Sequence, residues 1–196
     1  MELRKTTGWL AMVAWLIMAP GWYAFAKEGV PAMAFRSLAD ALSPIKTPEA
    51  LVQLMKKEFK YVEDERLLGQ NDHWQSPEEL WKRKAGDCED FALFAQYVLK
   101  KQGFETQVVS LYGAGGYGHT VAVFKKNGKY HVVNEDRLSY YNASSLEEAL
   151  TRVNPGWIWA SIATRRGGRG WSLREIRNPS PAPVFSHSDP FSELPF

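Results

Sequence analysis

The chain of 196 residues contains one cysteine, Cys88, in the segment Gly86-Asp87-Cys88-Glu89-Asp90. A single thiol cannot form an internal disulfide or a multi-cysteine metal site, so Cys88 is a buried apolar residue, an intermolecular bridge or a reactive nucleophile. Asp87 has the character of a helix N-cap, and a thiol in the first turn of a helix is stabilised as thiolate by the helix dipole, which favours the nucleophile. The neighbouring carboxylates oppose that effect, so the thiolate needs a further cation or an imidazolium nearby.

A hairpin positions the histidine that could serve Cys88. The dipeptide Asn127-Gly128 is a strong signal for a two-residue loop, and it joins predicted strands at residues 119–125 and 129–136. In this register His119 lies opposite Asp136. We therefore expect His119 at the end of the hairpin that is farthest from the loop.

The same register sorts the residues that could orient the imidazole of His119. Side chains alternate between the two faces of a strand, so Asn134 and Asp136 share the face of His119, whereas His131 and Glu135 point to the other face. A thiol nucleophile needs a base such as His119 and an acceptor that fixes the ring, and either Asn134 or Asp136 can be that acceptor. A developing oxyanion needs hydrogen-bond donors, and a backbone N–H at the start of a helix is suited to this role. In this chain the candidate donor is the backbone N–H of Cys88.

The N-terminal segment predicts export. Arg4-Lys5 is followed by the eleven-residue apolar run Trp9–Ala19 and by the small-x-small pattern Ala24-Phe25-Ala26. The run is shorter than the about 20 apolar residues of a membrane span. We expect a signal peptide at residues 1–26, cleaved after Ala26, and a periplasmic or secreted protein; an uncleaved N-terminal membrane anchor is the alternative. An unpaired cysteine in an exported protein strengthens the nucleophile interpretation.

Composition indicates a packed domain without nucleic acid as its partner. The content of 45% hydrophobic and 13% aromatic residues is typical of a globular fold, and the net charge is only +2. The short basic cluster Arg165–Arg169 is interpreted as a solvated loop. We expect an irregular lead-in at 27–46, a catalytic domain at 47–177 and a disordered tail at 178–196.

Capping signals and hydrophobic periodicity predict helices up to residue 101 and mainly strands after it, with one further helix among the strands. The glycine-rich segment 113–118 lacks the spacing of a nucleotide-binding loop and is interpreted as a flap or a close-packing turn. The predicted helices are 34–42, 48–62, 77–84, 88–101 and 146–152, and the predicted strands are 105–112, 119–125, 129–136 and 157–164.

With these residues in place, the chain resembles the transglutaminase-like cysteine peptidases, members of the wider papain-like group. The resemblance covers residues 61–136 and rests on the segment Trp74–Leu80, on Gly-Asp-Cys-Glu-Asp at 86–90, and on Gly118-His119-Thr120-Val121. It implies a papain/transglutaminase-like α+β fold with a Cys-bearing helix packed on an antiparallel β-sheet. Family members carry the third triad residue about fifteen positions after the histidine, which implies Cys88, His119 and Asn134 as the triad, with Asp136 as the alternative third residue.

The resemblance also implies a candidate cofactor. Exported bacterial members that trim adhesins require calcium, with ligands among the acidic residues that flank the cysteine. Asp87, Glu89 and Asp90 match that pattern, Asp72 is a further candidate, and oxygen ligands suit calcium. The alternative is that these acids are only an N-cap and helix-dipole partners.

We therefore expect an exported thiol hydrolase that cleaves a peptide or isopeptide amide bond in a protein or peptide substrate through a thioester. The chemistry itself requires no cofactor, and membrane contact is expected only through an uncleaved signal peptide. Trp74 or Gln75 is the candidate second oxyanion donor. The alternatives are transglutaminase-type acyl transfer to an amine and a catalytically inactive binding module, for which ligand contact could come from Trp74, Trp81, Trp157, Trp159 and Trp171.

Overall fold

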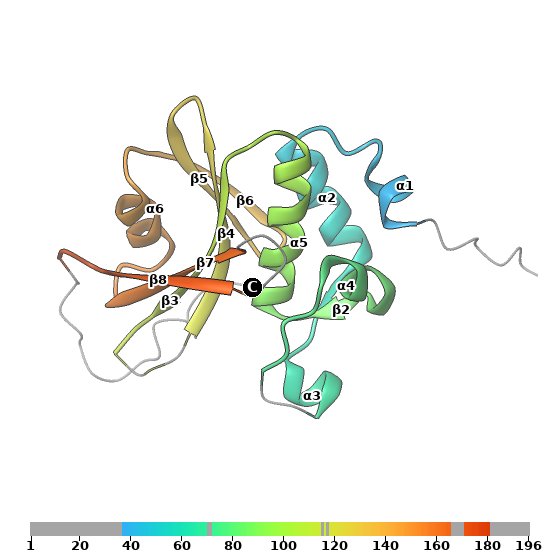
Figure 1. Cartoon of the computed structure of the whole chain (residues 1–196), viewed down its shortest axis with the longest axis horizontal. Helices are drawn as coiled ribbons and strands as arrows, with labels where there is room; N and C mark the ends of the chain where they lie inside the picture. Colours follow the sequence, from blue (N-terminus) through green and yellow to red (C-terminus); the bar gives the residue numbers. More distant parts are fainter. Residues whose placement is uncertain (1–36, 70–71, 115, 117, 166–170, 181–196) are drawn as a thin grey trace, which may run out of the picture. The chain divides into compact units, whose positions relative to one another are not determined.

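A six-stranded antiparallel sheet and the helix that begins at Cys88 organise this computed structural model (Figure 1). The structure describes residues 37–69, 72–114, 116, 118–165 and 171–180. The predicted signal peptide, the first ten residues of the predicted lead-in, the core of the basic cluster and residues 181–196 of the predicted tail lie outside them. None of the helices in the described part has the length and apolar character of a membrane span.

The strands of the large sheet follow the order β6-β5-β4-β3-β7-β8, and every neighbouring pair is antiparallel. A separate parallel pair joins β1 (Lys60–Tyr61) to β2 (Ala85–Gly86) immediately before the cysteine helix. The large sheet consists of β3 (Thr106–Tyr112), β4 (Gly118–Lys126), β5 (Lys129–Asn134), β6 (Arg137–Ala143), β7 (Trp159–Arg165) and β8 (Trp171–Arg177).

The helices begin where the capping signals predict. Thr47, Ser76 and Ser145 each accept a hydrogen bond from the backbone N–H three residues later, which satisfies a donor that the helix itself cannot. The helices are α1 (Leu38–Leu42), α2 (Pro48–Glu58), α3 (Asp64–Leu68), α4 (Pro77–Arg83), α5 (Cys88–Lys101) and α6 (Leu146–Val153).

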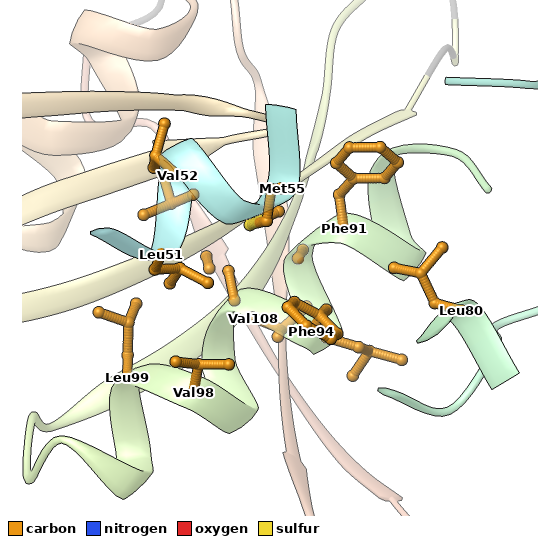
Figure 2. Packing of buried hydrophobic residues seen from close by; sticks show 14 of the residues in the cluster. Leu51, Val52, Met55, Leu80, Phe91, Phe94, Val98, Leu99 and Val108 are labelled. Carbon is orange, nitrogen blue, oxygen red and sulfur yellow. The ribbon is translucent and has the colours of Figure 1, made fainter. Parts of the chain in front are cut away.

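Each face of the sheet has its own hydrophobic core because side chains alternate along the strands. On one face, α5 packs on β3, β4 and β5, and Phe94 and Leu99 meet Val108 in a cluster that also takes in α2 and α4 (Figure 2). On the other face, α6 covers Val109 and its neighbours (Figure 1). Leu38 and Leu42 of α1 also pack in the α5-side core, so part of the predicted lead-in is structured.

The structure confirms the predicted α+β fold with a Cys-bearing helix on an antiparallel sheet, and it confirms the hairpin register, with Lys126 opposite Lys129. The helix α2 is shorter than the predicted 48–62, since Phe59 leaves the helix with φ −116° and ψ 150° and packs in the core. The strand β5 ends at Asn134 instead of residue 136, because Glu135 adopts φ 49° and begins the turn into β6.

Candidate active site

The N-terminus of α5 is held in place by the paired strands β1 and β2. Asp87 is the N-cap and is buried, and Cys88 is the first helical residue. The backbone N–H of Val62 donates to the carbonyl of Gly86, which ties the approach to α5 to strand β1. The backbone that carries the thiol is therefore held by helix α5 on one side and by strand β1 on the other.

Asp90 connects α5 to the segment before α4. Its carboxylate accepts hydrogen bonds from the Gln75 backbone N–H at 2.7 Å and from Gln75 Nε2 at 2.5 Å, and it accepts the Asp87 N–H at 3.3 Å. Burial nevertheless raises the pKa of Asp90 to about 6. Gly86 lies against this contact, since a Cβ there would come within 2.2 Å of Asp90 Oδ2. Asp90 is thus a structural crosslink.

The histidine and the amide that the register placed on one face are hydrogen-bonded. His119 Nε2 lies 2.7 Å from Asn134 Oδ1. An amide oxygen accepts only, so Nε2 carries the hydrogen and the neutral ring bears its lone pair on Nδ1. Asp136 lies in the β5–β6 turn, where the strand register no longer applies.

The Cys88 thiol lies beside the strand that carries His119. The Thr120 backbone lies close enough to the sulfur to lower the pKa of Cys88, and the thiol donates to Glu89 Oε2 at 3.1 Å. The ladder between β4 and β5 begins only at Ala122, so residues 118–121 of β4 extend beyond the last β5 pair. The sulfur therefore lies near the β4 backbone where β5 has ended, one residue along the strand from His119, whose side chain shares the face of Val121.

Burial dominates the electrostatics of both reactive groups. It raises the pKa of Cys88 well above its usual value, with a further contribution from the Glu89 charge, and the Thr120 hydrogen bond only partly offsets this. Burial also lowers the pKa of His119, against the opposing effect of Asn134. The resting pair is a thiol and a neutral imidazole.

Two donors were predicted for an oxyanion, and their surroundings differ. The Cys88 N–H is at the first position of α5, where the helix offers no acceptor. The amide nitrogen of Gln75 donates to both Asp90 Oδ2 and the Ala85 carbonyl, so both of its hydrogens are used. Gln75 therefore positions the segment, and Trp74, which packs on the α5-side core, stays the candidate second donor.

Three carboxylates form a cluster close to the thiol. Ligand oxygens of Asp64, Asp87 and Glu89 all lie within 4.8 Å of one another. In the described part of the chain, Asp64 Oδ1 and Asp87 Oδ1 are buried without a hydrogen-bond partner, and burial together with the Glu89 charge raises the pKa of Asp87. Such a set is costly for a folded protein unless a cation compensates it.

This cluster differs from the predicted ligand set in one member. Asp87 and Glu89 are in it, whereas the oxygens of Asp90 are used in the crosslink. Asp72 is close enough that its charge raises the pKa of Glu89. Asp64 was missed by sequence reasoning, since no spacing rule connects it to the cysteine motif; only the acidic character of 63–65 marks it.

Tyr61 is a second residue that sequence reasoning missed. Its hydroxyl donates to Glu63 at 2.9 Å, and burial raises its pKa, with a smaller contribution from the nearby Cys88. The charge of Glu63 also acts on Glu135 in the β5–β6 turn, whose pKa burial raises. Polar and acidic side chains thus border the site on the side of β1 and the β5–β6 turn.

A cysteine at the start of a helix, packed on an antiparallel sheet that carries a paired histidine and amide, defines the class of papain-like and transglutaminase-like folds. Residues 31–158 match the sequence profile of the Transglutaminase-like superfamily, and the chain belongs to this family. Comparison with curated proteins gave no match.

Several solved structures are similar at low sequence identity. Calcium-bound LapG of Legionella pneumophila is 18% identical, with 81% of this chain and 84% of LapG covered and a TM-score of 0.44. EGTA-treated LapG of the same organism is 19% identical, with 70% and 77% covered and a TM-score of 0.43. A structure described as a TGase is 17% identical, with 60% and 34% covered and a TM-score of 0.40.

Proposed function

We propose that the protein is a thiol hydrolase that cleaves a peptide or isopeptide amide bond with Cys88, His119 and Asn134. The hydrogen bond of 2.7 Å between His119 Nε2 and Asn134 Oδ1, on the strand whose next residue contacts the Cys88 sulfur, carries this proposal. Covalent catalysis by a thiol requires an imidazole that is fixed by an acceptor, and Asn134 fixes His119 in this way on the strand next to the start of α5.

In the proposed reaction the Cys88 proton moves to His119 Nδ1 as the sulfur attacks the substrate carbonyl carbon. The tetrahedral oxyanion is stabilised by the Cys88 N–H, with Trp74 as the candidate second donor. The C–N bond then breaks, the leaving amine takes the proton from His119, and a thioester remains. His119 next activates a water that adds to the thioester, which releases the acid and regenerates the thiol.

We also propose that Asp64, Asp87 and Glu89 bind a calcium ion. The two unpartnered carboxylate oxygens and the short separation of the three groups support an oxygen-binding cation of this kind. A bound calcium ion would supply positive charge that compensates the carboxylates beside Cys88. The signal peptide and a periplasmic or secreted location stay part of the proposal on sequence grounds.

The hydrolase proposal is tested by incubating the protein with a peptide library and identifying cleaved bonds by mass spectrometry, with and without EGTA. Cleavage should vanish in Cys88→Ala and fall by about 10²-fold or more in His119→Ala, since a positioned general base contributes ~10²–10⁴. Addition of a primary amine distinguishes hydrolysis from acyl transfer by product mass. Cleavage that persists in Cys88→Ala would contradict the proposal.

A further inference from the structure

Two stacked aromatic rings lie on the sheet near the candidate active site. The rings of Tyr112 on β3 and Trp159 on β7 have centroids 3.8 Å apart and planes inclined by only 10°. Both residues are half-buried, and among the described residues neither belongs to the two hydrophobic cores. Trp157, two residues earlier on the chain, is instead fully buried and donates from Nε1 to Thr151, as a core tryptophan does.

The strand register assigns this pair to the face that carries α5. Val108 and Ala163 face the α5-side core, and they pair with each other across β3 and β7. Tyr112 follows Val108 by four residues and Trp159 precedes Ala163 by four, with an unbroken register between them. Because side chains an even number of residues apart share a face, both rings lie on the α5 side of the sheet.

The strands also fix how far the pair lies from the nucleophile. Tyr112 pairs with Gly118 on β4, and Thr120, whose backbone contacts the Cys88 sulfur, is two residues farther along. Two residues of a strand span about 7 Å, and β3 and β7 lie about 5 Å and about 10 Å farther across the sheet from β4. An extended peptide that is held at Cys88 and runs across these strands would bring a side chain a few residues from the scissile bond to this pair.

Gly118 allows the Tyr112 ring to approach β4 closely at this point. It is exposed, and a Cβ there would come within 2.9 Å of Tyr112 Cε1. The absent side chain lets the Tyr112 ring lean over β4 and leaves a surface made of backbone and an aromatic ring. The acidic border of the site lies elsewhere, at Glu63 before α3 and at Glu135 in the β5–β6 turn.

We propose that Tyr112, Trp159 and Gly118 form a subsite for an apolar side chain of the substrate, a few residues from the bond that is cleaved. This inference rests on the proposed function. Uncharged ring surfaces recognise aliphatic and aromatic side chains by removing apolar area from water. The subsite therefore selects peptides with such a side chain near the scissile bond over otherwise identical peptides with serine at that position.

The test measures kcat/KM for pairs of peptides that differ only in leucine or serine at each position near the cleaved bond. In Trp159→Ala and Tyr112→Ala, the preference for the leucine peptide at one position should fall about 10-fold or more, within the range of ~10- to 200-fold that an apolar pocket gives. Trp159→Phe and Tyr112→Phe keep a stack and should retain most of the preference. Leu173→Ala is the control, because Leu173 is an apolar side chain on the same face that is 67% exposed. It pairs with Ala163, about 14 Å along β7 from Trp159. This variant should leave the leucine preference unchanged.

Two further readouts separate this inference from the proposed function. The rate of Cys88 alkylation by iodoacetamide should be unchanged in the Tyr112 and Trp159 variants, which shows that the catalytic groups are intact. Calorimetric binding of the same peptide pairs to Cys88→Ala requires no catalysis, and Trp159→Ala in that background should lose the leucine preference. Cleavage or binding in which the Tyr112 and Trp159 variants discriminate as well as the wild type would overturn the subsite. Binding with ring-dependent preference but without cleavage would keep the subsite and contradict the hydrolase.

Discussion

The thiol of Cys88 is held as an acid by its surroundings, although it stands at the positive end of a helix. The helix dipole and the Thr120 N–H favour thiolate, but burial and the carboxylate of Glu89, 3.1 Å from the sulfur, outweigh them. The sequence suggested this conflict, since three acids flank the cysteine. It could not give the outcome, because burial depends on how β4 and α5 meet.

Asn134 and Asp136 were both candidates to orient His119, and substitution can separate them. We predict that Asn134→Ala lowers kcat/KM by about 10- to 100-fold, as part of the ~10²–10⁴ that a positioned base provides. The reason is that His119 Nε2 loses its acceptor at 2.7 Å and the ring is no longer fixed. Asp136→Ala, in the adjacent turn, is the control and should stay within 2-fold. Loss of activity in Asp136→Ala with a silent Asn134→Ala would reverse the assignment.

The buried imidazole of His119 makes stability depend on pH in one direction. Its pKa is lowered from 6.5 in the folded protein, so below pH 6.5 the unfolded chain takes up the proton more readily. The stabilisation is complete above pH 6.5 and is lost as the pH falls through the lowered pKa. Urea unfolding at several pH values between 5 and 8 should show a smaller loss of unfolding free energy toward acid in His119→Gln than in the wild type. Parallel curves for the two proteins would contradict this prediction.

At the scale of elements, the site depends on a contact between the segment before α4 and the first turn of α5. Gln75 and Asp90 are fully buried, and Gly86 fits between them because it has no side chain. Since Cys88 lies between Gly86 and Asp90 in the chain, this contact sets where the thiol points. A substitution that breaks this contact should therefore lower both the stability of the fold and the rate of catalysis.

We predict that Gly86→Ala costs about 1–3 kcal/mol of unfolding free energy, because its Cβ would collide with the Asp90 side chain. Asp90→Asn should cost a similar ~1–3 kcal/mol, since an amide NH₂ then faces donors of Gln75. Both substitutions damage one contact, so the double variant should cost less than the sum by at least about 0.5 kcal/mol. Strict additivity in urea unfolding would show that the two residues act separately.

Local signals predicted the elements that frame this contact but not the whole sheet. Thr47, Ser76 and Asp87 start helices as their types suggest, and Asn127-Gly128 set the hairpin register correctly. Strand β6 was missed because its residues are mostly half-buried or exposed and alternate weakly, and β8 because it is an edge strand with exposed polar positions. Their place depends on pairing with β5 and β7, which only the tertiary structure supplies.

At the scale of the whole molecule, the site joins segments that are distant in sequence. Asp64 belongs to α3, Cys88 to α5, His119 to β4 and Asn134 to β5. The register predicted that His119 and Asn134 share a face, since both lie on one hairpin. No local pattern could bring α3 to the first turn of α5, because that requires the parallel pairing of β1 with β2. The carboxylate cluster is therefore the part of the site that depends most on the complete fold.

A cation bound by Asp64, Asp87 and Glu89 would connect α3 to α5, so binding should stabilise the folded chain. At a calcium concentration of 100 Kd the gain is about 2.7 kcal/mol, which for a domain of this size raises Tm by about 5–10 °C. We predict this shift in thermal unfolding of the wild type and of Cys88→Ala, and its loss with EGTA and in Asp64→Asn. Glu78→Gln, which removes an exposed charge from α4, is the matched control and should keep the shift. An equal shift in Asp64→Asn would exclude α3 from the binding site and would leave the unpartnered oxygens of this cluster without their proposed ligand.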